Sequence, residues 1–235
     1  MDVNGGRRGG LLLAAVAVIG VLVVVLAVRG QEPDPPPAPK DVGSLDATAT
    51  PSQRPSQRPS EPPSQQSAQD PVGPASAQPL GPSSPVSISV PRIDVSSEVI
   101  TLGTTDDGIL EVPQPGPDLD KAAWFDKSPT PGQPGPAIIE GHVSTKEGGP
   151  SVFFDLARLR PGDDITVQRQ DGTTVTFEVY AVRTFAKDKF PTQLVYGGDL
   201  STPTLRLITC SNFDASIGHH TGNLVVFSKL TDVHD

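Results

Sequence analysis

The stretch "DITVQRQDGTTVTFEV", residues 164–179, decides the class of fold. Apolar and polar residues alternate on both sides of Asp171-Gly172, and β-branched residues are frequent. This pattern is typical of two strands that each bury one face. Asp-Gly between two such runs predicts a two-residue type I′ turn, and therefore an antiparallel hairpin.

Short runs of the same kind recur on both sides of this hairpin, and turn signals such as "DDG" (106–108) and "PG" (161–162) separate them. They lie at 86–90, 97–103, 109–112, 137–142, 204–210 and 223–230. Only 151–159 and 191–197 favour short helices. Residues 86–235 are therefore predicted to form one mainly all-β domain, a closed barrel of about eight strands with one or two short helices.

A long apolar run near the N-terminus indicates the compartment. Residues 11–28 carry no charge, and 18 helical residues span about 27 Å, close to the thickness of a bilayer core. Arg7 and Arg8 precede the run and Arg29 follows it, which favours a cytoplasmic N-terminus at residues 1–10. No A-x-A site follows, so an uncleaved signal anchor is expected rather than a cleaved signal peptide. The predicted location is the cell membrane, single-pass, with the β-domain outside the cytoplasm.

Between this run and the β-domain, residues 29–85 are rich in proline, serine and glutamine. The segment includes a tandem repeat, "PSQRPSQRPS", at 51–60. Almost none of its side chains could fill a core, so a disordered linker is predicted.

Charge and metal-ligand spacing exclude two classes of function. The net charge of -9 argues against a nucleic-acid partner, which favours a basic surface. The histidines at 142, 219, 220 and 234 and the acidic residues show no metal-ligand spacing. We therefore expect no metal and no cofactor.

The run "TLRLITC" (204–210) ends in the only cysteine of the chain, Cys210. A cysteine nucleophile needs a basic neighbour, because the thiolate is the form that attacks. His142 ends another strand-like run, and two strand ends can meet at one mouth of a barrel. The alternatives are a packed, inert thiol and a solvated histidine.

Several spaced motifs resemble the sortases, the cysteine transpeptidases of Gram-positive cell surfaces. They are "GPAIIEGHVST" (135–145), "PSVFFDLARLRPGD" (150–163), "FPTQLVYG" (190–197), "LRLITCSNFD" (205–214) and "IGHHTGNLVVFSKL" (217–230). The order of membrane anchor, linker, histidine and late cysteine also resembles theirs. The pattern is most similar to the actinobacterial class F sortases.

The resemblance implies a closed β-barrel in which Cys210 attacks a threonine carbonyl of an LPxTG-like sorting signal, between threonine and glycine. A thioacyl enzyme forms, and an amine of a peptidoglycan precursor or a pilin resolves it. His142 would act as general acid and then as general base. The implied partners are surface proteins that carry the signal.

Sortases also use an arginine near the start of the last strand, and here the matching position is Thr221. Arg206 is a candidate substitute, because residues i and i+4 of a strand share a face and Cys210 lies four residues later. Its alternative is an ion pair at the barrel surface. Ile208 lies between them and would line the substrate pocket, and Thr209 would help to hold the substrate carbonyl. Further candidates are His219, His220 and Arg183.

Other functions remain open on the sequence. An L,D-transpeptidase would carry an "SHGC" run, which is absent, and in a papain-like or NlpC-type hydrolase the cysteine precedes the histidine. A non-catalytic or weakly active adaptor with a sortase fold is the third alternative, favoured by threonine at position 221.

Overall fold

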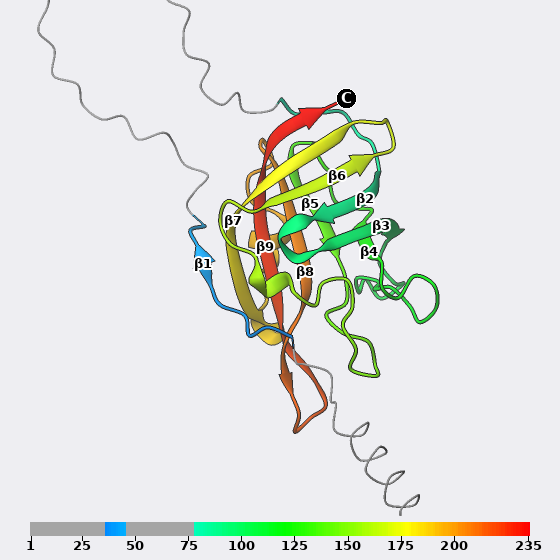
Figure 1. Ribbon diagram of the computed structural model, residues 1–235, viewed down its shortest axis with the longest axis vertical. Coiled ribbons are helices and arrows are strands. Elements are labelled where there is room, and N and C mark those ends of the chain that lie inside the picture. The colour runs from blue at the N-terminus through cyan, green and yellow to red at the C-terminus, as the bar shows by residue number, and fades with distance from the viewer. Residues whose placement is uncertain (1–35, 46–77) are drawn as a thin grey trace, which may run out of the picture. The chain divides into compact units, whose positions relative to one another are not determined.

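The computed structural model describes residues 36–45 and 78–235 (Figure 1). The predicted membrane span at 11–28 lies outside these residues. Within them, no helix has the length and apolar character that a membrane crossing requires.

Eight strands close into a barrel. They are β2 (Pro85–Val90), β3 (Val95–Leu102), β4 (Ala122–Phe125), β5 (Gly135–Glu140), β6 (Asp164–Arg169), β7 (Thr174–Ala186), β8 (Pro203–Asp214) and β9 (His219–His234). The sheet runs β7-β6-β2-β3-β4-β5-β8-β9, and β9 pairs with β7 to close it (Figure 1). The predicted closed all-β barrel is confirmed. The pairs β3–β4 and β5–β8 are parallel, and the other pairs are antiparallel.

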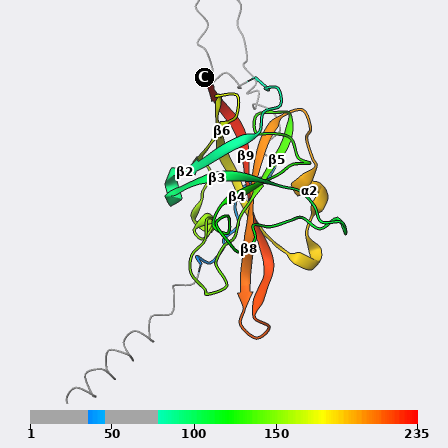
Figure 2. The same cartoon turned by 90° about the vertical axis from the view of Figure 1, so that its right-hand side faces the viewer.

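Among the described residues the helices are short, as the sequence predicted for the β-domain. The α-helix of this part of the chain, α2 (Thr192–Tyr196), lies outside the barrel (Figure 2). Three single-turn 3₁₀ helices accompany it: η1 (Pro91–Ile93), η2 (Leu156–Arg158) and η3 (Lys187–Lys189). The predicted helices at 151–159 and 191–197 correspond to η2 and α2.

A ninth strand, β1 (Val42–Gly43), pairs with β7 in a segment that the sequence placed in the disordered linker. For residues 36–45 that expectation was wrong, because backbone pairing and the guanidinium of Arg183 hold the segment. Arg183 donates to the carbonyl oxygens of Val42 and Gly43. A side chain at Gly43 would meet the Tyr180 carbonyl oxygen at 2.0 Å, so this close approach requires glycine.

The hairpin between β6 and β7 forms as predicted, but its turn is different. Gly172 has a positive φ of 92°, whereas Asp171 does not, so the turn is not type I′. Gly172 N donates to Arg169 O, and Arg169 N donates to Thr173 O. This is a three-residue loop with a bulge at glycine, in which Asp171 keeps ordinary backbone angles and accepts a bond from Thr173 N.

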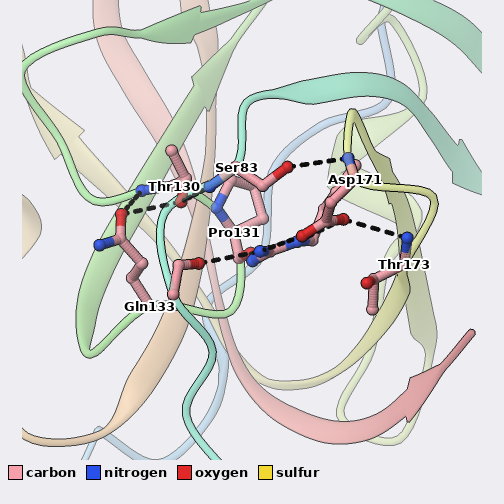
Figure 3. A network of polar contacts seen from close by, with 8 residues as sticks. Ser83, Thr130, Pro131, Gln133, Asp171 and Thr173 are labelled. Carbon is pink, nitrogen blue, oxygen red and sulfur yellow. Dashed lines mark hydrogen bonds and ion pairs between the residues drawn. The ribbon is translucent and has the colours of Figure 1, made fainter.

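The buried guanidinium of Arg169 joins this hairpin to two other segments. Arg169 is 2% exposed and donates to the carbonyl oxygens of Pro131 and Gly81 and to the Asp171 carboxylate. Figure 3 shows the surrounding network, in which Ser83 and Asp171 are also hydrogen-bonded to each other. The start of the domain is thereby fixed to the barrel where β2 begins.

Apolar side chains fill both the inside of the barrel and part of its outer surface. The interior cluster contains Phe153, Phe177, Leu205 and Leu207 among its buried members. A second cluster, which we call the outer cluster, contains Ile138, Tyr180, Ala181, Val195, Ile208, Val225 and Phe227, with Leu45, Phe125, Phe185, Phe190 and Tyr196 packed against it. Because alternate residues of a strand point to opposite faces, Arg206, Ile208 and Cys210 lie on the outer-cluster face of β8.

Candidate active site

The end of β5 is bound to β8 beside Cys210. The last register pair of these parallel strands is Glu140 with Ile208. Beyond it, Gly141 N donates to Ile208 O at 3.1 Å, and the Thr209 hydroxyl donates to Gly141 O at 2.8 Å. The residue before Cys210 is therefore tied to the residue before His142.

His142 and Cys210 each follow one of these bonded residues, Gly141 and Thr209, so the bonds hold the two candidate residues in the same part of the sheet. His142 Nε2 lies 2.8 Å from Pro113 O. A carbonyl oxygen can only accept, so this bond places a proton on Nε2 and leaves Nδ1 as the basic nitrogen of a neutral ring. No direct hydrogen bond joins the His142 ring to Cys210 Sγ in this structure.

Cys210 is partly exposed and has a cation next to its sulfur. Lys187 Nζ lies 3.7 Å from Cys210 Sγ. Lys187 is the first residue of η3, directly after β7, and its side chain is exposed. The sequence analysis missed it, because no local pattern connects a residue after one strand with the end of another. Only the register of β7, β9 and β8 together brings them to the same place.

Arg206 shares the face of Cys210, as predicted, but the structure does not bring the two together. Four strand residues span about 13 Å. The guanidinium of Arg206, 7% exposed, lies over the rings of Phe227 and Tyr180 at 4.7 and 5.9 Å. It donates to the carbonyl oxygens of Leu205 and Ser228.

The surroundings of Arg206 also differ from the alternative of a surface ion pair. None of the ion pairs among the described residues includes it, and its Nε is buried without a partner. Burial lowers the pKa of its guanidinium. Arg206 therefore acts as a buried support of the outer cluster, at a distance from the reacting sulfur.

The other predicted residues have distinct environments. Ile208 is buried in the outer cluster, between Arg206 and Cys210 on the same face of β8. Thr209 uses its hydroxyl to bind Gly141 O, so it positions the loop that carries His142. Thr221 is exposed, and its hydroxyl donates to Asn212 O at 3.1 Å across the β8–β9 hairpin.

The two adjacent histidines of β9 are not equivalent. His219 is exposed, and its Nδ1 contacts Ile217 O at 3.0 Å. His220 is half-buried against Phe213, and its Nδ1 is buried without a partner. Burial and then the nearby charge of Lys187 lower the pKa of His220.

A second titratable group lies on the same face of the sheet. Glu140 follows Ile138 by two residues, so its side chain points to the outer cluster, and it is 7% exposed. Burial raises the pKa of Glu140 to about 8. Its charge in turn contributes to the raised pKa of Tyr196, of which burial is the main cause. Across residues 36–45 and 78–235, no three His, Cys, Asp or Glu side chains gather in a way that could hold a metal ion.

The comparison with known families agrees with this geometry. A family model described as Sortase domain matches residues 88–231, which is more than half of the chain. None of the curated proteins matches the chain.

Solved sortase structures are similar at low identity. Sortase A from Corynebacterium diphtheriae is 23% identical, with 64% of this chain and 61% of that chain covered and a TM-score of 0.48. Sortase A of Listeria monocytogenes is 19% identical, with 66% and 90% covered and a TM-score of 0.47. Sortase C1 from Streptococcus agalactiae is 23% identical, with 63% and 67% covered and a TM-score of 0.49. The chain thus spans less than two thirds of the corynebacterial protein.

Proposed function

Since this chain belongs to the sortase family, we propose that it cleaves an LPxTG-like sorting signal between threonine and glycine and transfers the new acyl group to a cell-wall amine. The observation that supports the proposal is the binding of Gly141, the residue before His142, to Thr209, the residue before the single thiol of the chain. The sequence motifs alone do not require the segments that carry His142 and Cys210 to be bonded to each other.

The proposed reaction has two steps. Cys210 first gives its thiol proton to Nδ1 of His142, which leaves a thiolate and a protonated imidazole. The thiolate attacks the threonine carbonyl carbon, a C–S bond forms, and the carbonyl electron pair moves to oxygen. As the C=O bond re-forms, the C–N bond to glycine breaks, and His142 gives a proton to the leaving amine. In the second step the incoming amine attacks the thioester, His142 takes its proton, and the Cys210 thiolate is released.

The outer cluster supplies a binding surface for the apolar part of the signal. Ile208 lies two residues before Cys210 on the same face, and Phe125, Phe190 and Tyr196 pack against that cluster. Phe190 and Tyr196 belong to the segment between β7 and β8, which also contains α2. We infer that this segment forms one side of the surface that binds the sorting signal, and that it contributes to the choice of signal.

The finer assignment to the class F group rests on the motif set around Cys210 and His142. The membrane location rests on the uncharged run at 11–28. In this arrangement the N-terminus lies in the cytoplasm, and the barrel meets surface proteins and peptidoglycan precursors or pilins outside the membrane. A second candidate function is a non-catalytic sortase-fold adaptor, which the uncharged Thr221 favours.

A peptide-cleavage assay distinguishes these functions. The full chain in detergent is incubated with quenched fluorescent peptides of the LPxTG type, with and without an added amine acceptor. We expect cleavage between threonine and glycine, a ligated product with the amine, and loss of both reactions in Cys210→Ala and His142→Ala. Binding of the peptides without cleavage would contradict the enzymatic proposal and favour the adaptor.

A further inference from the structure

Lys187 is a charged residue next to the reacting sulfur that the sequence motifs do not include. We propose that Lys187 is the third catalytic residue, the cation that holds the Cys210 thiolate and then the oxyanion derived from the substrate. This inference rests on the proposed function and names a further residue of the same site.

The strand register explains why Lys187 reaches this position. Cys210 of β8 pairs with Asn223 of β9, and Asn223 pairs on its other side with Phe185 of β7. Residues directly opposite one another point to the same face, so these three side chains share the outer-cluster face. Lys187 begins η3 two residues after Phe185, where β7 has ended, and its ammonium contacts Cys210 Sγ on that face.

The same register relates Lys187 to Thr221. The last β7–β9 pair is Ala186 with Gly222, and Lys187 and Thr221 are the residues directly next to this pair along the chain. The exposed Thr221 hydroxyl is already used in a bond to Asn212 O. Lys187, just after the end of β7, supplies beside Cys210 the positive charge that Thr221 lacks.

The contact itself has the chemistry of thiolate activation. An ammonium 3.7 Å from a thiol sulfur favours the charged, nucleophilic form of the cysteine. Lys187 forms no ion pair with a carboxylate among the described residues, so its charge is not neutralised locally. The titratable groups that face this site are His142 from the end of β5 and His220 from β9.

The same ammonium can then act on the substrate. When Sγ attacks the carbonyl carbon, the electron pair of the C=O bond moves to the carbonyl oxygen. This oxygen and the sulfur are then bonded to the same carbon. A donor that already contacts the sulfur is within a short side-chain movement of that oxygen, and Lys carries three rotatable N–H groups. A charged donor to a developing oxyanion stabilises it more than a neutral hydroxyl does.

The test uses the fact that the chain has a single thiol. The rate of Cys210 alkylation by iodoacetamide is measured against pH in the full chain in detergent, for wild type, Lys187→Met and Lys187→Arg. Lys189→Met is the matched control, because Lys189 ends the same 3₁₀ helix and is exposed. Cleavage of an LPxTG-type peptide is measured in parallel.

We expect Cys210 of Lys187→Met to be alkylated about tenfold more slowly near neutrality, because the ammonium beside its sulfur is removed. The kcat/KM of this variant should fall by about 10²-fold, the loss typical of one oxyanion donor. Lys187→Arg should restore most of both quantities, and Lys189→Met should resemble wild type.

Two results would overturn the proposal. One is an alkylation profile and a kcat/KM in Lys187→Met that both equal those of wild type. The other is an equal effect of Lys189→Met, which would indicate general surface charge instead of a contact. If wild type cleaves no peptide, the proposed function fails, but the alkylation profile still tests the contact between Lys187 and Cys210.

Discussion

The buried carboxyl group of Glu140 makes the stability of this barrel depend on pH. Glu140 ends β5 and points to the outer cluster, and no ion pair to it exists among the described residues. Because burial alone is responsible, the charged form is the one that is disfavoured. The variant Glu140→Gln keeps the size of the side chain and removes its titration.

The size of the effect follows from the pKa of the carboxyl in the two states. The pKa rises from 4.5 in the unfolded chain to about 8 in the folded protein, equivalent to about 5 kcal/mol in total. Between these pH values the folded state binds a proton that the unfolded state has lost, so the free energy of unfolding falls as pH rises. The stability that comes from the protonated Glu140 carboxyl in the folded state is fully present below about pH 4.5 and absent above about pH 8. Between pH 5 and 8.5 the expected loss is about 4 kcal/mol.

Urea unfolding at pH 5 and pH 8.5 measures this loss. Raising the pH from 5 to 8.5 should lower the unfolding free energy of wild type by about 4 kcal/mol more than that of Glu140→Gln. The variant is therefore more stable relative to wild type at pH 8.5 than at pH 5. Glu147→Gln is the control, because Glu147 is exposed, and it should follow wild type at both pH values. Parallel pH dependence of wild type and Glu140→Gln would refute the reasoning.

Three further substitutions have defined outcomes. Arg169→Met should lower the unfolding free energy by about 2–4 kcal/mol in urea titration, because two buried carbonyl oxygens lose a charged donor; an unchanged midpoint would contradict this. Thr209→Val removes the bond to Gly141 O and should lower kcat/KM about tenfold, because the loop that carries His142 is no longer bound to β8. The alkylation profile of Cys210 should stay unchanged. A wild-type kcat/KM would show that the hydroxyl is dispensable. Arg206→Met should keep kcat/KM within about threefold of wild type, since its guanidinium binds backbone carbonyls and aromatic rings away from the sulfur; a loss near 10²-fold, the size of an oxyanion donor, would return it to a direct role.

The sequence predicted seven of the eight barrel strands, because period-two alternation depends only on which face of each strand is buried. It missed the short, almost wholly buried β4, and the predicted strand at 109–112 forms only an isolated bridge between Leu110 and Thr104. The turn at Asp171-Gly172 was mispredicted, since the same dipeptide fits a type I′ turn and a bulged loop. The pairing of β1 with β7 was not predicted. Residues 36–45 lie in a proline-rich, mainly polar stretch of sequence. What holds them is backbone hydrogen bonding, the side chain of Arg183 and the packing of Val42 and Leu45, which depend on residues far away in the chain.

The candidate site was predictable where the evidence was local. His142 and Cys210 each end a strand-like run in the sequence, and the structure binds Gly141, before His142, to Thr209, before Cys210. β8 itself continues past Cys210 to Asp214, because it pairs with β9 in a hairpin that the sequence did not indicate. Arg206 was correctly placed on the face of Cys210, but the aromatic rings that cover it come from β7 and β9, which no spacing within β8 reveals. Lys187 could not be found for the same reason, because its contact with sulfur depends on the combined register of three strands.

The central claim is that Cys210 forms a thioacyl bond with a sorting peptide. Intact-mass spectrometry of the full chain, incubated with LPxTG-type peptides and no amine, tests this claim most directly. The account predicts a mass increase equal to the peptide acyl fragment that ends in threonine, release of the glycine fragment, and no increase in Cys210→Ala. A thiol that alkylates readily but never carries the acyl fragment, across peptides that the protein binds, would contradict it.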